Sequence, residues 1–94
     1  MPTPEGKLKD EVKEYLSSLP NCFFYMPVPT GYGVRGLQDF IVCWEGLFFA
    51  IETKAKGGKE TPWQTRTREK VIAAGGRAIV AYKIEDCYAI FSRP

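Results

Sequence analysis

The sequence predicts an α/β fold, in which helices flank a small mixed β-sheet. Two stretches begin with Thr-Pro, which is a common helix start, and four short apolar runs have the length and composition of strands. The resulting order is helix, three strands, helix, strand, and it is typical of an α/β sandwich around one sheet. At 94 residues the chain is expected to form a single domain, residues 1–94, with a modest core.

The first helix is predicted to begin at Thr3-Pro4-Glu5 and to end before Pro20-Asn21. Thr3 is the cap, Pro4 takes the first helical position and Glu5 is an acid in the first turn. Apolar side chains then recur at helical spacing, at Leu8, Val12, Tyr15, Leu16 and Leu19. Glu5 is in line with this apolar stripe, so it can point along the buried edge of the helix towards the sheet.

Three strands are predicted next. Cys22–Met26 is a short aromatic strand, and the prolines and glycines of Pro27–Gly36 indicate an irregular loop. Phe40–Trp44 and Leu47–Ile51 are near-continuous apolar runs, as expected of strands that are covered on both faces. The Glu45-Gly46 pair between them predicts a two-residue hairpin loop.

The rest of the chain is predicted to add a helix and a strand. Residues 55–60 form a flexible basic loop, after which Thr61-Pro62-Trp63-Gln64 has the pattern of a capping box. Gly75-Gly76 closes that helix, and Arg77–Tyr82 is an apolar strand. Ile84–Phe91 is compatible with either a turn of helix or a strand.

The hairpin is predicted to bring two acids, Asp39 and Glu52, close to one lysine, Lys54. If Trp44 faces Leu47, counting back sets Asp39 directly opposite Glu52, and Lys54 shares the strand face of Glu52. Two opposed carboxylates are destabilising unless a cation lies between them. One or two hard cations, Mg²⁺ or Mn²⁺, suit such oxygen ligands, with the Thr53 carbonyl completing the coordination. The alternative is a surface aspartate and a Glu–Lys pair at an exposed strand end.

Gln64 and Glu5 each have two interpretations. As the third residue of a capping box, Gln64 can bond back to the cap, or it can serve an active site. Glu5 can interact favourably with the helix dipole in the first turn, or act as a further metal or water ligand.

Positive charge is concentrated in the second half of the chain. Residues 1–52 carry four Lys or Arg against seven Asp or Glu, whereas residues 53–94 carry nine against four. A basic half beside an acidic cluster suits a polyanion such as DNA, although a solvated mixed surface has the same composition. The candidate DNA contacts are Arg35, Lys56, Lys59, Arg66 and Arg68 for phosphates, and Tyr32 for stacking on an unpaired base. A solvated helix face and packing of Tyr32 on the protein are the competing interpretations.

Composition excludes several classes of site. The chain has no histidine, which excludes Ser-His-Asp and Cys-His catalysis and histidine metal sites. Cys22, Cys43 and Cys87 are widely spaced and lack a CxxC pair, so they are expected to be reduced, mostly buried thiols of a cytosolic protein. No apolar run reaches the roughly 20 residues that a membrane-spanning helix needs, so no membrane association is expected.

Five motifs in order resemble the VRR-NUC (virus-type replication-repair nuclease) family of the PD-(D/E)xK nuclease superfamily. They are Thr3-Pro4-Glu5-Gly6-Lys7, Gly31-Tyr32-Gly33, Gly36-Leu37-Gln38-Asp39-Phe40, Ile51-Glu52-Thr53-Lys54-Ala55 and Gln64. The resemblance covers nearly the whole chain and implies a restriction-endonuclease-like core. It departs in one place, because the family's proline before the acid is Gln38 here. Proline sets backbone shape and is not a ligand, so this departure concerns the approach of Asp39 to its strand.

The resemblance also implies a function. It assigns metal ligands at Asp39 and Glu52, a catalytic lysine at Lys54, and supporting active-site roles to Glu5 and Gln64. The implied activity is Mg²⁺- or Mn²⁺-dependent hydrolysis of DNA phosphodiesters in repair or recombination. Stand-alone phage or bacterial members resemble homodimers that resolve four-way (Holliday) junctions, in the cytoplasm of a bacterial or phage-infected cell. A flap nuclease or exonuclease of the same chemistry and a non-catalytic DNA-binding fold-mate are the alternatives.

Overall fold

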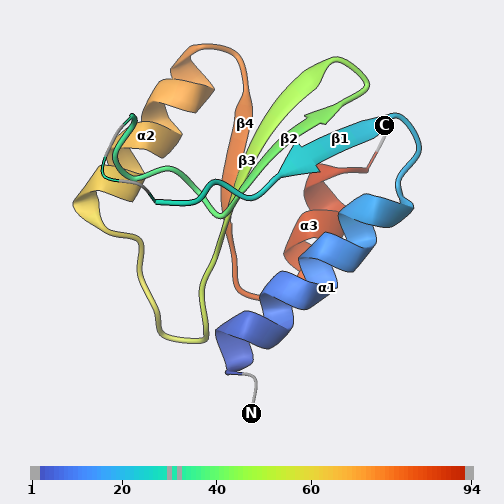
Figure 1. Cartoon of the computed structure of the whole chain (residues 1–94), viewed down its shortest axis with the longest axis horizontal. Helices are drawn as coiled ribbons and strands as arrows, with labels where there is room; N and C mark the ends of the chain where they lie inside the picture. The colour runs from blue at the N-terminus through green and yellow to red at the C-terminus, as the bar shows by residue number, and fades with distance from the viewer. Residues whose placement is uncertain (1–2, 30, 32, 93–94) are drawn as a thin grey trace.

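Three helices and one four-stranded sheet make up the computed structural model, which describes residues 3–29, 31 and 33–92. Along the chain the elements are α1 (Pro4–Ser18), β1 (Cys22–Tyr25), β2 (Phe40–Trp44), β3 (Leu47–Thr53), α2 (Pro62–Ala73), β4 (Arg77–Ala81) and α3 (Ile84–Ile90). The predicted order of helix, three strands, helix and strand is therefore confirmed, with one more helix at its end (Figure 1).

Helix α1 begins and packs as its sequence pattern predicts. The Thr3 hydroxyl accepts a hydrogen bond from the Gly6 amide at 3.0 Å, and Pro4 opens the helix. Leu8, Val12 and Leu16 are its buried residues, four apart, so one stripe of the helix faces the sheet.

The sheet has the strand order β1-β2-β3-β4, with both β1–β2 and β2–β3 antiparallel and β3–β4 parallel. The predicted hairpin register is confirmed, because Trp44 pairs with Leu47 and Phe40 with Ile51. The turn residues Glu45 and Gly46 have φ of 51° and 83°, which is the combination that a type I′ hairpin turn requires.

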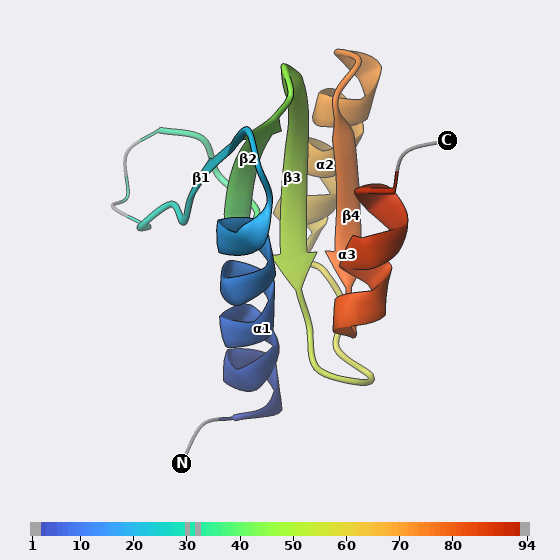
Figure 2. The same cartoon turned by 90° about the vertical axis from the view of Figure 1, so that its right-hand side faces the viewer.

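The helices form two layers around this sheet. Helices α1 and α3 cover one face and α2 lies on the other (Figures 1 and 2). The core lies beneath α1 and α3, where the rings of Trp44, Phe49 and Phe91 contact one another at centroid distances of 4.5–6.1 Å. Other fully buried members of this core include Val12, Leu16, Phe40, Val42, Ile51 and Cys87.

The prediction that β2 and β3 are covered on both faces is wrong for part of the sheet. Cys43, Phe48 and Phe23 of neighbouring strands are paired side by side and all three side chains are exposed. They lie on the α2 side of the sheet, but α2 packs against β4, so it leaves the β1–β2 half of that face open. The apolar side chains of these strands on the α2 side are therefore partly exposed and are not all buried beneath a helix.

The three cysteines differ in burial, which corrects the expectation of mostly buried thiols. Cys43 is exposed, Cys22 is half-buried and Cys87 is fully buried. Burial raises the pKa of the Cys87 thiol to about 12 and also raises the pKa of Cys22. Cys87 is thus an inert core residue.

Ile84–Phe91, which the sequence left open between helix and strand, is helical over Ile84–Ile90. The Asp86 carboxylate accepts hydrogen bonds from the amides of Tyr82 and Lys83, which fixes the start of α3. None of the helices in the described part of the chain is long and apolar enough to cross a membrane.

Candidate active site

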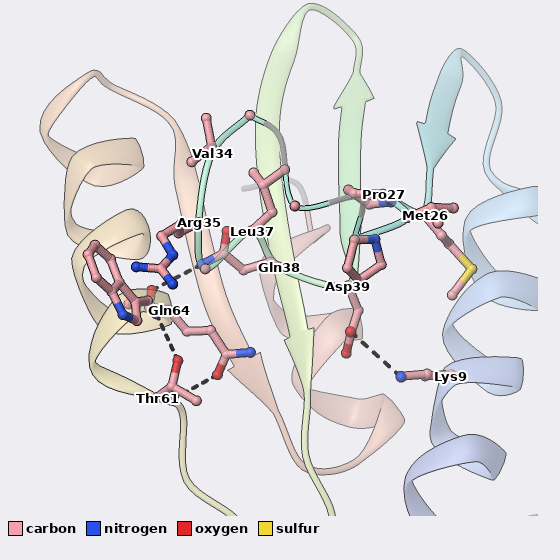
Figure 3. A pocket seen from close by; sticks show the side chains of 16 residues that line it. Lys9, Met26, Pro27, Val34, Arg35, Leu37, Gln38, Asp39, Thr61 and Gln64 are labelled. Atoms are coloured by element: carbon pink, nitrogen blue, oxygen red, sulfur yellow. Dashed lines mark hydrogen bonds and ion pairs between the residues drawn. The ribbon is translucent and has the colours of Figure 1, made fainter.

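Charged and polar side chains from three segments converge where β3 ends. Glu52 and Thr53 are the last residues of β3 and Lys54 follows them, Asp39 directly precedes β2, and Gln64 lies in the first turn of α2. Figure 3 shows Asp39 pointing towards Lys9 of α1 on one side and Gln64 approaching from α2 on the other. The sheet end therefore collects groups from both helical layers.

Glu52 is a buried acid with an incomplete set of partners. Glu52 is only 3% exposed. Its Oε2 accepts a hydrogen bond from Gln64 Nε2 at 3.0 Å and lies 3.4 Å from Lys54 Nζ. Its Oε1 is buried and has no hydrogen-bond partner among the described residues. Burial raises the pKa of Glu52 to about 7, the negative charge of Asp39 adds to the rise, and Lys54 opposes it.

Asp39 departs from its predicted orientation. It precedes the paired part of β2, so strand alternation does not set the direction of its side chain. Asp39 Oδ2 accepts hydrogen bonds from the Thr53 amide at 3.0 Å and the Thr53 hydroxyl at 2.6 Å, and Oδ1 lies 3.7 Å from Lys9 Nζ. Its carboxylate thus turns towards Thr53 and α1 and does not simply share the face of Glu52 and Lys54. The Thr53 carbonyl stays a predicted ligand.

Gln64 forms the predicted capping box and also contacts Glu52, while its active-site role stays a prediction. Its Oε1 accepts a hydrogen bond from the Thr61 amide at 2.8 Å, and its own amide donates to the Thr61 hydroxyl at 3.1 Å, which completes the capping box. Its Nε2 remains free to donate to Glu52. Because the cap requires Oε1, it also fixes which end of the side-chain amide faces the carboxylate.

Lys9 links two acids and was not predicted as a site residue. Its ammonium lies 3.6 Å from Glu5 Oε2, in an i, i+4 pair, as well as close to Asp39. Glu5 is linked to Asp39 only indirectly, because Lys9 pairs with both acids. In the described part of the chain, Glu5 forms no ion pair with another residue. The spacing of Glu5 and Lys9 was the only sequence signal for this contact.

Two residues, Gln38 and Gly36, hold the loop before Asp39 against α2. Neither was predicted from the sequence as a site residue. Gln38 is 1% exposed, and its Nε2 donates to the Gln64 carbonyl at 3.2 Å. Gly36 has φ +73°, and a Cβ built there would lie 2.3 Å from the carbonyl carbon and oxygen of Trp63. The loop backbone therefore lies directly on the first turn of α2, which carries Gln64.

Replacing Gly36 with alanine is expected to destabilise the chain by more than about 2 kcal/mol, because it adds a backbone clash to left-handed strain. Gly33→Ala is the matched control, since Gly33 has φ +90° but open space around it, and it should cost only about 1 kcal/mol. Urea unfolding of both variants measures the difference. Equal losses would contradict the close packing of Gly36 on α2.

Among the described residues, one of the predicted DNA contacts is paired with an acid and the other cations form no ion pair. Arg68 makes a two-pronged contact with Glu60, with N–O distances of 2.6–3.1 Å, so its charge is already neutralised. The side chains of Arg35 and Arg66 lie against the Trp63 ring, and Lys56 and Lys59 are exposed on the loop after β3. Tyr32, the predicted stacking residue, lies outside the described residues.

The acids fit a metal ion that keeps most of its water. No group of three or more His, Cys, Asp or Glu that could hold a metal occurs among residues 3–29, 31 and 33–92. Mg²⁺, however, is commonly bound by one or two carboxylates plus water and substrate oxygens. Asp39 and Glu52 supply two carboxylates, and the Oε1 of Glu52 is a buried acceptor with no hydrogen-bond partner among the described residues. These residues therefore suit Mg²⁺ or Mn²⁺.

A solved structure described as a VRR_NUC domain has the same fold as this chain. The two superpose with a TM-score of 0.77 and 22% sequence identity, and the alignment covers 94% of each chain. No protein-family model and no curated protein matches the chain. At this identity the likeness establishes the fold, a small mixed sheet flanked by helices, and confirms the fold that the sequence motifs implied.

Proposed function

We propose that this chain is a VRR-NUC-type nuclease, which hydrolyses DNA phosphodiester bonds with Mg²⁺ or Mn²⁺. The observation that carries the proposal is Glu52, a buried carboxylate with one unpartnered oxygen beside a second acid and a lysine. A buried acid without full pairing is unfavourable for folding, so such a group is typical of a functional site. The shared fold of a VRR_NUC domain supports the same assignment.

Each residue has a distinct part in this proposal. Asp39 and Glu52, with the Thr53 carbonyl, would hold the ion; when bound, it would lower the pKa of a water and neutralise phosphate charge. The Lys54 ammonium would donate hydrogen bonds to the phosphate oxygens as their charge grows. Gln64 orients Glu52 through its capping box, and Lys9 offsets the charge of Asp39. Glu5 would act on the site through Lys9.

For the substrate we propose branched DNA, with the four-way junction first. The basis is the sequence resemblance to stand-alone family members, and two sites related by a twofold axis would suit paired cuts across a junction. The chain would then act as a homodimer, in the cytoplasm of a bacterial or phage-infected cell. A flap nuclease or exonuclease with the same residues is the second candidate, and a non-catalytic DNA binder is the third.

One assay separates these candidates. Four-way junction, flap, linear duplex and single-stranded DNA would be incubated with Mg²⁺, with Mn²⁺ and with a chelator. We expect metal-dependent cutting of the branched substrates, and a fall of about 10³-fold in Asp39→Asn, which removes a ligand charge. Asp10→Asn is the matched control, because Asp10 is exposed on α1.

Three outcomes would contradict parts of the proposal. Binding without cutting in either metal would remove the nuclease assignment and favour a DNA binder. Equal cutting of every substrate would remove only the preference for branched DNA. A strict monomer by light scattering at the working concentration would contradict paired cutting by a homodimer.

A further inference from the structure

The two oxygens of the Asp39 carboxylate have different partners. Oδ2 accepts hydrogen bonds from the amide and the hydroxyl of Thr53, at 3.0 and 2.6 Å, and these occupy both of its lone pairs. Oδ1 accepts no hydrogen bond from the described residues and lies 3.7 Å from the Lys9 ammonium. An ion that takes Asp39 as a ligand without breaking the Thr53 bonds must therefore bind Oδ1, where Lys9 already lies.

This oxygen is on an open side of the site. Lys9 and Asp39 both line a groove of about 650 Å³, and Gln64, which donates to Glu52, lines it as well. Figure 3 shows the Lys9 side chain extending from α1 towards the Asp39 carboxylate, with the ion pair drawn between them. Ions and water can thus reach Asp39 Oδ1 from this groove, and Lys9 can move into it.

Lys9 is held more loosely than the other lysine of the site. Lys54 lies 3.4 Å from Glu52 Oε2, and these two side chains are only 16% and 4% exposed. The pair of Lys9 and Asp39 is longer and its side chains are 33% and 22% exposed, and exposed pairs contribute little net free energy. Mg²⁺ carries twice the charge and approaches an oxygen ligand to about 2.0–2.1 Å, so it can displace the ammonium from Oδ1.

Glu5 gives the displaced ammonium another partner. It lies one helical turn before Lys9, and its Oε2 is 3.6 Å from the Lys9 Nζ. Glutamate four residues before lysine is the favourable order for such a pair on a helix. Lys9 can therefore leave Asp39 and keep one of its two ion pairs.

We propose that the Lys9 ammonium occupies the ion's place at Asp39 Oδ1 in the metal-free chain, and moves towards Glu5 when Mg²⁺ or Mn²⁺ binds. Lys9 is thus a positioning residue that acts through Asp39 and sets the metal affinity of the site. The proposal rests on the proposed function and deepens it by assigning the control of metal binding to α1. Removing a competitor makes the ion bind more tightly, whereas removing a ligand or a structural support makes it bind more weakly.

Metal titrations without DNA test this competition. The dissociation constant for Mn²⁺ would be measured by calorimetry at constant pH. Lys9→Met should bind Mn²⁺ about tenfold more tightly than the wild type, within the range by which partners of metal ligands change affinity. Lys9→Arg keeps the charge and should bind Mn²⁺ no more tightly than the wild type. Lys13→Met, which removes an exposed lysine of α1, is the charge-matched control and should match the wild type.

A second measurement follows Lys9 in the wild-type protein, so the proposal does not depend on a variant that folds poorly. The side-chain nitrogen resonance of Lys9 would be recorded by NMR in isotope-labelled protein and assigned with Lys9→Arg. We expect it to shift as Mg²⁺ is added, and to end near its position in metal-free Asp39→Asn, where only Glu5 is left to pair with it. A lysine with a purely structural role would stay beside Asp39 and would not reach that position.

Two results would overturn the proposal and leave the nuclease assignment intact. One is a folded Lys9→Met that binds Mn²⁺ no more tightly than Lys13→Met, and the other is a Lys9 resonance that stays in place at saturating Mg²⁺. If neither the wild type nor Lys9→Met binds either ion, the proposed metal-dependent function is contradicted and this proposal falls with it. If the ions bind as expected but no DNA is cut, only the proposed nuclease function is contradicted.

Discussion

Replacing Glu52 with glutamine is expected to abolish cleavage and, at the same time, to stabilise the folded chain above pH 7. Glutamine has nearly the same shape and retains an acceptor for Gln64 Nε2. It removes the negative charge that would bind the ion, so cleavage should fall by about 10³-fold or more. It also removes a charge that burial and Asp39 make unfavourable in the native state.

The expected pH dependence follows from the raised pKa of Glu52, which is about 7 against an ordinary value of 4.5. Below pH 4.5 the side chain is protonated in both the native and the unfolded state, and it contributes nothing to their difference. Between pH 4.5 and 7 the unfolded state loses its proton first, so native stability falls as pH rises. Above pH 7 the full cost remains, on the order of 3 kcal/mol.

The measurement is urea unfolding of wild-type and Glu52→Gln protein in chelator between pH 4 and 8. The variant should be about 1–3 kcal/mol more stable at pH 8, and the two proteins should converge at pH 4. Glu14→Gln, an exposed acid of α1, is the control and should match the wild type throughout. A variant that is less stable than the wild type at pH 8 would show that Glu52 is not under electrostatic strain.

The parts of the fold that were predictable from sequence are those with local causes. The Thr-Pro helix starts and the Glu45-Gly46 turn depend on a few neighbouring residues, and both are found as predicted. The hairpin register then follows by counting, since a tight turn leaves no other pairing. The uncovered half of the sheet could not be predicted this way, because an apolar strand reads the same whether or not a helix covers it.

The direction of Asp39 shows why part of the site could not be predicted. The register placed it correctly beside β3, but the residue lies outside the ladder, so tertiary contacts with Thr53 and Lys9 set its side chain. For the same reason the packing of Gly36 on Trp63 had no sequence signal beyond a glycine. Gln64 was within reach of sequence reasoning, because its capping box is a local pattern. Its bond to Glu52 required the fold.

Replacing Lys54 with methionine should have the second large effect, because its ammonium serves both Glu52 and the proposed phosphate. Lys54 Nζ lies 3.4 Å from Glu52 Oε2, and its side chain is only 16% exposed. Loss of one charge-stabilising donor should lower the cleavage rate about 10²–10³-fold.

Because Lys54 opposes the rise in the pKa of Glu52, the Lys54→Met variant should keep Glu52 protonated to higher pH. Single-turnover rates between pH 6 and 9 should therefore show residual activity shifted towards higher pH, whereas Lys13→Met should leave both rate and profile unchanged.

A double-mutant cycle separates the two roles of Lys54. In the wild-type background, Lys54→Met leaves Glu52 without its cation and should cost about 1–3 kcal/mol of stability at pH 8. In the Glu52→Gln background there is no charge left to offset, so the same substitution should cost far less. If both backgrounds lose equal stability, Lys54 acts through packing of its aliphatic chain and not through Glu52. If the cycle shows the expected coupling while Lys54→Met still cleaves at the wild-type rate, the lysine only supports the buried acid and another cation must meet the phosphate.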